Sequence, residues 1–164
     1  RGGRSGPIAT LRRGMNRYER QIKLQEVGPE GQNRLSRAKV LIVGVGGLGC
    51  PAALYLSAAG VGTIGLMDHD KVDMTNLHRQ VLFQESDLGK PKAVAAAEHL
   101  SSRNGEVVFE IIQEALTQEN AQSIIGGYDI VLDGTDNFET RFALNRACVS
   151  ANVPLVSGAS MLYF

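Results

Sequence analysis

The chain has 164 residues, of which 43% are hydrophobic and 21% are charged, a composition typical of one globular domain with its own core. No apolar run approaches the roughly 18 residues of a membrane-spanning helix, so neither a membrane protein nor a membrane partner is expected. Acidic and basic residues balance at 17 each, but six arginines lie in the first 21 residues, where Glu19 is the sole acid. The basic excess is therefore local, which argues against nucleic acid as a partner.

The first 14 residues, RGGRSGPIATLRRG, are rich in glycine and arginine and contain no acidic or aromatic residue. This composition predicts a disordered basic extension. A targeting segment and a basic binding arm are alternatives. We favour an extension upstream of a natural start at Met15, because residues 16–37 read as helical, with an interruption at Gly28-Pro29. The folded domain is expected over residues 15–164.

After this helical region, short apolar runs alternate with helical patterns, and glycine or proline marks most junctions. The predicted strands cover residues 40–44, 63–68, 107–113, 128–133 and 153–157. The predicted helices cover residues 47–59, 90–103, 117–126 and 138–151. This alternation predicts an α/β fold, namely a Rossmann-like doubly wound, mainly parallel sheet with helices on both faces. Ligands of such sheets bind at the carboxyl ends of the strands, so the functional side chains are expected to converge there.

The two cysteines, Cys50 and Cys148, are almost a hundred residues apart, and each lies within a helical pattern. Zinc sites need clustered thiols, and disulfide scaffolds need more cysteines. We therefore interpret both as small apolar side chains of the core.

A glycine-rich turn follows the first predicted strand. Gly44, Gly46 and Gly49 satisfy the pattern G-x-G-x-x-G between a strand and a helix, with Gly47 as an additional glycine. The first glycine permits a tight turn, the second lets the backbone approach phosphate, and the third packs helix against strand. Asp68 ends the second predicted strand, where a carboxylate would bind ribose hydroxyls. These features predict a nucleotide site and leave open whether it takes NAD, FAD or ATP.

The segment after the second strand favours a triphosphate. Asn76 and Arg79 lie within DHDKVDMTNLHRQ, residues 68–80, and a dinucleotide dehydrogenase has no need of them there. A triphosphate carries more charge than one helix terminus can neutralise. Lys92 falls in the first turn of a predicted helix, where a lysine is unfavourable unless an anion compensates it. Lys90, two residues earlier, is interpreted as an ordinary surface lysine.

A third group of polar residues, Asp133-Gly134-Thr135-Asp136-Asn137, follows the fourth predicted strand. Carboxylates beside a phosphate site would repel the substrate unless a cation intervened, and Mg²⁺ accepts one or two carboxylates together with phosphate oxygens. The alternative is a structural role, because Thr135, Asp136 or Asn137 could cap the helix that starts near residue 138.

Six separated motifs together resemble the adenylylating enzymes of sulfur-carrier and ubiquitin-like proteins, the MoeB and ThiF type. The motifs are R-Y-x-R-Q, V-G-x-G-G-L-G, D-x-D, N-L-x-R-Q, G-x-P-K and D-x-T-D-N, and they agree in order and spacing over residues 15–160. The resemblance implies that the carboxylate of a small carrier protein ending in Gly-Gly attacks the α-phosphorus of ATP. Pyrophosphate leaves and an acyl-adenylate forms.

The resemblance also implies residue roles. The glycine turn, Asp68 and Asp70 would bind the nucleotide, and the phosphates would be held by Asn76, Arg79 and Lys92. Asp136 would hold Mg²⁺, and Arg20 would reach the γ-phosphate of a neighbouring subunit. The catalytic set implied in this way is Arg20, Arg79, Lys92 and Asp136. A site completed by a second subunit implies a homodimer, and the family implies a cytoplasmic enzyme.

The chain departs from the family at its carboxyl end. Relatives continue beyond this point and carry two Cys-x-x-Cys pairs for a structural zinc ion, whereas Met161–Phe164 leave the family pattern. We therefore expect an ATP-binding adenylation domain that is incomplete relative to the family and has no zinc site in this chain. The alternatives are a non-catalytic nucleotide-binding module and an NAD- or FAD-binding oxidoreductase domain.

Overall fold

A computed structural model describes residues 16–159. The chain divides into two compact units, residues 1–34 and 35–164. The expected disorder of residues 1–14 and the departure at Met161–Phe164 fall outside the described residues. None of the described helices is both long enough and apolar enough to cross a membrane.

The first unit contains the short helix α2 (Glu19–Ile22) and all of α3 (Gly28–Leu35) except its last residue. The predicted interruption is present, but Gly28-Pro29 opens α3. Proline is well tolerated in a first helical turn, because the N–H that it lacks would have no partner there. Inside this unit, the side chain of Gln21 donates a hydrogen bond to the buried Gln32.

The second unit is built on a parallel sheet of five strands in the order β3-β2-β1-β4-β5. The strands are β1 (Lys39–Val43), β2 (Thr63–Met67), β3 (Val108–Ile112), β4 (Ile130–Asp133) and β5 (Leu155–Ser157). The last residues of β1, β2 and β4 are in register, with Val43 opposite both Met67 and Asp133. The loops that leave these three strands therefore start at the same edge of the sheet.

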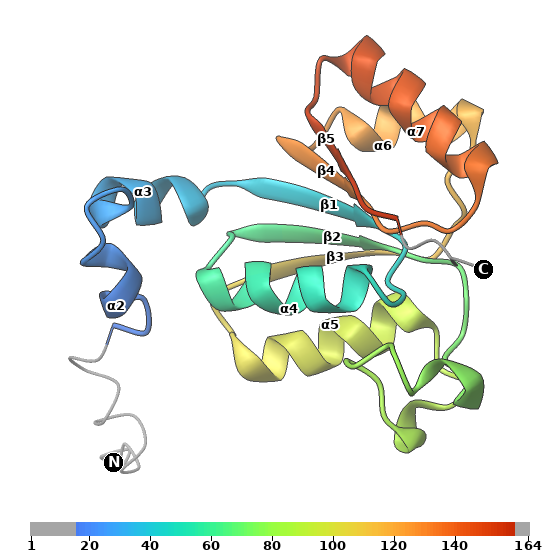
Figure 1. Cartoon of the computed structure of the whole chain (residues 1–164), viewed down its shortest axis with the longest axis horizontal. Coiled ribbons are helices and arrows are strands. Elements are labelled where there is room, and N and C mark those ends of the chain that lie inside the picture. Colours follow the sequence, from blue (N-terminus) through green and yellow to red (C-terminus); the bar gives the residue numbers. More distant parts are fainter. Residues whose placement is uncertain (1–15, 160–164) are drawn as a thin grey trace, which may run out of the picture. The chain divides into compact units, whose positions relative to one another are not determined.

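Helices cover both faces of this sheet (Figure 1). Val40 and Ile42 of β1 pack on one side with α4 (Gly49–Ala59) and α5 (Lys92–Arg103). Leu41 and Val43 pack on the other side with α6 (Gln118–Ile125) and α7 (Phe138–Ala151). The central strand is apolar on both faces because both are covered. The predicted Rossmann-like doubly wound fold is confirmed.

Both cysteines are buried free thiols in the core, Cys50 in α4 and Cys148 in α7, as predicted. Burial raises the pKa of the Cys50 thiol to about 11, and burial also raises the pKa of Cys148. Both side chains are therefore protonated at neutral pH and behave as small apolar groups.

The segment between β2 and α5 forms two short 3-10 helices, η1 (Met74–Asn76) and η2 (Glu85–Asp87). It is tied to α5 by the carboxylate of Asp87, which is 1% exposed. The Nε2 atom of His99 lies 2.6 Å from one oxygen of Asp87, and the Lys90 ammonium donates to the other at 3.2 Å. Lys90 also pairs with Glu98 at the surface, which agrees with its interpretation as a surface lysine.

We predict that Asp87→Asn lowers the free energy of unfolding by about 2 kcal/mol at pH 7, because it replaces the buried carboxylate that accepts from His99, Lys90 and the Gln84 N–H with a neutral and weaker acceptor. Burial by itself raises the pKa of Asp87, but hydrogen bonds from His99, the Gln84 backbone and Lys90 outweigh it and hold the pKa below the ordinary 3.8. The stabilisation is therefore present above pH 3.8 and is lost as the pH falls through the lower folded-state value.

Urea unfolding at pH 7 and at progressively lower pH measures this difference. The gap between wild type and Asp87→Asn should narrow in acid. The control is Glu98→Gln, which removes only the exposed partner of Lys90 and should cost less than about 0.5 kcal/mol. Equal unfolding midpoints for Asp87→Asn and wild type at pH 7 would contradict the role of Asp87.

Candidate nucleotide-binding site

The glycine turn between β1 and α4 is in close contact with the loop that follows β4. Gly44 has a φ of +87°, and a Cβ there would lie 3.0 Å from the carbonyl of Gly134. A Cβ on Gly49 would lie 1.9 Å from the oxygen of Gly44. The fold therefore requires glycine at positions 44 and 49, and the loops after β1 and β4 meet as predicted.

Gly46 and Gly47 differ from these two glycines. A Cβ on Gly46 would approach Gln80 at 3.6 Å, and one on Gly47 would approach the Arg79 side chain at 3.6 Å, which are ordinary contacts. The protein itself leaves room for a side chain at both positions. Glycine here fits a backbone that a ligand approaches closely, as a phosphate does in a turn of this kind. This observation supports the predicted fit of a nucleotide phosphate.

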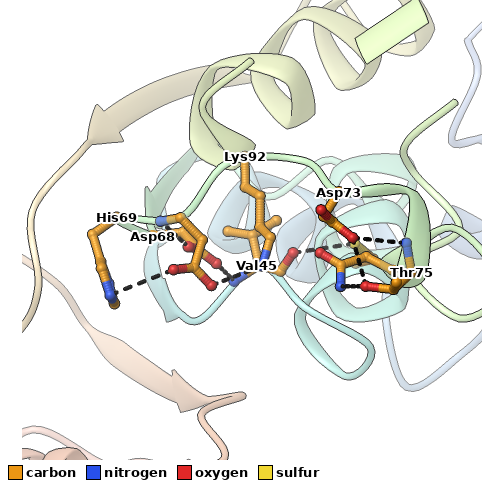
Figure 2. A network of polar contacts seen from close by, with 9 residues as sticks. Val45, Asp68, His69, Asp73, Thr75 and Lys92 are labelled. Carbon is orange, nitrogen blue, oxygen red and sulfur yellow. Dashed lines mark hydrogen bonds and ion pairs between the residues drawn. The ribbon is translucent and has the colours of Figure 1, made fainter. Parts of the chain in front are cut away.

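Asp68 fixes the end of β2 against the glycine turn. One of its oxygens accepts a hydrogen bond from the N–H of Val45 at 2.8 Å, and the other accepts from the N–H of Asp70 at 2.9 Å (Figure 2). The residue is buried, with 8% exposure. Each oxygen retains a further acceptor position, so the predicted ribose-binding role remains compatible with this structural role.

Lys92 is the first residue of α5 and its side chain is only 7% exposed. Its ammonium donates to the carboxylate of Asp70 at 2.9 Å, and its backbone N–H donates to the carbonyl of Asp70 at the same distance. The opposite oxygen of Asp70 lies 3.5 Å from Nε2 of His69. The structure thus brings together three residues predicted to contact the nucleotide, Asp68, Asp70 and Lys92.

Arg79 lies against the glycine turn from the segment that contains η1. Asp73 caps η1 by accepting from the N–H and the hydroxyl of Thr75 (Figure 2). The guanidinium of Arg79 donates to the carbonyl of Thr75 at 3.2 Å. Within residues 16–159, Arg79 has no carboxylate partner. Asn76, in the same turn, is half-buried, and its amide makes a single long contact of 3.5 Å, with Thr75, in the part of the chain that the structure describes.

The two acidic residues after β4 have different roles. Asp133 is buried, and it accepts hydrogen bonds from the N–H and hydroxyl of Thr135 and from the hydroxyl of Ser157. Of the three candidate caps, Asn137 is the one that caps α7, accepting from the N–H of Thr140. Asp136 is exposed and makes no hydrogen bond or ion pair with any described residue. It is therefore the carboxylate of this loop that is available to a cation.

Two structural features of the candidate site escaped prediction. The first is Gln80, which is 4% exposed and whose side chain lies against Gly46. Its Oε1 atom has no hydrogen-bond partner among the described residues. Its place in the N-L-x-R-Q motif was the available signal. The second feature is the pairing of Asp70 with Lys92, which are 22 residues apart.

Two other features bear on the predicted site residues. Arg20 lies on α2 in the unit of residues 1–34, and its predicted contact with a γ-phosphate stays a prediction. Asp68, His69 and Asp70 bring ligand-type atoms within 4.8 Å of one another. However, the oxygens of Asp68 already accept from the backbone and Asp70 neutralises Lys92, so this group has an internal explanation.

Comparison with known proteins agrees with this geometry. The chain matches the ThiF family over residues 18–163. It is 50% identical over 145 residues to the adenylyltransferase and sulfurtransferase MOCS3 of Anopheles gambiae, covering 88% of this chain and 33% of that protein. It is also 50% identical over 145 residues to the sulfur carrier protein adenylyltransferase of Thermus thermophilus, covering 88% and 54%. The chain thus spans a third to about half of the length of these relatives.

Solved structures share the fold. E. coli tRNA N6-threonylcarbamoyladenosine dehydratase, TcdA, in complex with ATP superposes with a TM-score of 0.80 at 32% identity, over 86% of this chain and 58% of that chain. E. coli MccB with AMPCPP and MccA gives a TM-score of 0.75 at 34% identity, over 87% and 44%. With nearly all of its described residues matched, the chain belongs to the ThiF family.

Proposed function

We propose that this chain is the ATP-binding part of an adenylyltransferase that transfers AMP to the C-terminal Gly-Gly carboxylate of a ubiquitin-like sulfur carrier and releases pyrophosphate. The observation that carries the proposal is the set of groups around the glycine turn. An open backbone at Gly46 and Gly47 lies beside Arg79, a cation that pairs with no carboxylate of residues 16–159. That arrangement suits an anionic ligand.

The relatives support ATP as this ligand. The MOCS3 and Thermus thermophilus proteins are named adenylyltransferases, the latter of a sulfur carrier protein. TcdA was crystallised with ATP. An NAD- or FAD-dependent oxidoreductase would use the glycine turn and Asp68 but would leave Asn76, Arg79 and Lys92 without a purpose.

In the proposed reaction, the protein positions the carrier carboxylate and ATP and neutralises the charge of the phosphates. The carrier carboxylate is ionised at neutral pH, so it attacks the α-phosphorus without a general base, and the electron pair of the breaking P–O bond leaves with pyrophosphate. Arg79 and Lys92 would neutralise the charge that develops on the phosphates, with Asn76 as a hydrogen-bond donor. Asp68 would hold the ribose, which fixes the α-phosphorus relative to the glycine turn.

Mg²⁺ fits the corner at Asp136. Asp136 is exposed and has no partner among the described residues, and Mg²⁺ binds such a carboxylate together with phosphate oxygens. The bound ion would supply charge neutralisation on the triphosphate. We further propose a cytoplasmic homodimer in which Arg20 completes the site of the neighbouring subunit.

Exchange of labelled pyrophosphate into ATP tests the function directly. We expect exchange when the natural protein that carries residues 1–164 is mixed with a ubiquitin-like carrier ending in Gly-Gly, ATP and Mg²⁺. A carrier from which Gly-Gly has been removed should give none. ATP binding without carrier-dependent exchange would instead indicate a non-catalytic nucleotide-binding module and would overturn the proposal.

The same assay tests Asp136. Asp136→Asn should abolish most of the exchange with Mg²⁺ present, because a metal ligand is lost, while ATP affinity in a chelator should stay unchanged or improve slightly. Glu139→Gln, which neutralises an exposed acid in the first turn of α7, is the matched control and should retain exchange. Since Asn137 caps α7, a lost cap cannot explain an effect. Wild-type exchange in Asp136→Asn would end the metal role.

Arg79→Ala should weaken ATP binding by about 2–4 kcal/mol, because a charged partner of the phosphates is removed. Its effect on AMP should be smaller, and adenosine should bind as it does to wild type. Calorimetric titration of the three ligands measures this order, with Arg146→Ala, an exposed arginine on α7, as the control. If Arg79→Ala binds ATP normally, Arg79 is a surface side chain and the phosphate site lies elsewhere.

A further inference from the structure

Lys92 depends on a single counter-ion in the described structure. Its ammonium is buried and donates to the Asp70 carboxylate at 2.9 Å, the one ion pair that Lys92 makes within residues 16–159. It also begins α5, whose first turn contains no acidic residue. A buried ammonium is costly when unpaired, and the positive end of a helix adds to that cost. The pairing with Asp70 therefore offsets the cost of burying the Lys92 ammonium and holds the side chain in place.

The two side chains of this ion pair differ in their exposure to solvent. The Lys92 side chain is 7% exposed, whereas the Asp70 side chain is 56% exposed. The backbone of Asp70 is fixed, because its N–H donates to Asp68 and its carbonyl accepts from the N–H of Lys92. Rotation of its carboxylate is therefore the movement that the packing permits. His69, at 3.5 Å from the other oxygen, offers an alternative partner on the exposed side.

Because a phosphate and the Asp70 carboxylate are both anions, their sharing of the Lys92 ammonium is opposed by mutual repulsion. We propose that Lys92 exchanges counter-ions on nucleotide binding: Asp70 holds the ammonium in the empty site, and a phosphate of ATP displaces the Asp70 carboxylate towards His69. This inference rests on the proposed function, which assigns phosphate to Lys92. Asp70 is thus a positioning residue of the empty site and a competitor of the substrate.

If Asp70 were a direct ligand of the nucleotide, its removal would weaken ATP binding, whereas the exchange of counter-ions predicts tighter binding. Asp70→Asn should tighten ATP binding about fivefold, since the phosphate no longer has to displace a carboxylate, and should leave adenosine affinity unchanged. The nucleotide-free variant should melt at a lower temperature, because Lys92 has lost its counter-ion. Dissociation constants from calorimetric titration and melting temperatures measure these effects in the natural protein.

Two controls separate this exchange from a general loss of negative charge. Asp73→Asn makes the same chemical change three residues away, on a carboxylate that bonds to Thr75 and interacts with the charge of Lys92 without forming an ion pair with it. It should change ATP affinity less than Asp70→Asn does. In a Lys92→Met background, the increase in ATP affinity caused by Asp70→Asn should fall to the increase caused by the Asp73→Asn control.

The exchange is overturned if Asp70→Asn binds ATP no more tightly than wild type does. It is also overturned if Asp70→Asn tightens ATP binding as much in the Lys92→Met background as it does in the wild-type background. A crystal structure of the wild-type protein with a non-hydrolysable ATP analogue provides a test without mutation. We expect Lys92 Nζ on a phosphate oxygen and the Asp70 oxygen beyond about 4 Å, the limit of an ion pair. An intact 2.9 Å pair in that complex also overturns the exchange. A wild-type protein that binds no ATP would instead sink the proposed function.

Discussion

The close approach of two loops at the carboxyl edge of the sheet is the constraint on which the site depends. Val43 is in register with both Met67 and Asp133, so the chain leaves β1, β2 and β4 at one level. Gly44 and Gly134 then come so close that a methyl group at either position would meet backbone atoms at 2.8–3.0 Å. The backbone at Gly46 and Gly47 has room for a ligand, with the side chains of Gln80 and Arg79 beside it.

The carboxylates at this edge serve two different purposes. Asp68 and Asp133 are buried, and their oxygens accept hydrogen bonds from nearby backbone and hydroxyl groups, so they shape the loops. Asp70 and Asp136 are exposed, and Asp136 has no partner among the described residues. Net charge alone would suggest an acidic site that repels nucleotides. However, Asp68 and Asp133 are occupied by internal hydrogen bonds, and Asp70 is paired with Lys92. The positive charge of Arg79 therefore remains available to phosphate.

Much of this arrangement could be predicted from the sequence. Each predicted strand and helix of the sheet region is present, with boundaries that differ by at most two residues, because periodicity and glycine breaks mark them locally. Register also follows, since parallel strands of a doubly wound sheet end at one edge. The 3-10 helices of residues 74–87 could not be predicted, because side-chain caps such as Asp73 on Thr75 create them without a hydrophobic period. The Asp70–Lys92 pair likewise depends on a tertiary contact between residues 22 positions apart, and the proposed contact of Arg20 with a nucleotide would depend on a second subunit.

The central claim is that the glycine turn serves a triphosphate rather than a dinucleotide. Its most direct test is to titrate one preparation of the protein with ATP and Mg²⁺ and with NAD, and to compare the dissociation constants. The arrangement of Arg79 and Lys92 around the open backbone predicts that ATP binds at least about tenfold more tightly than NAD. NAD binding that equals or exceeds ATP binding would contradict the account.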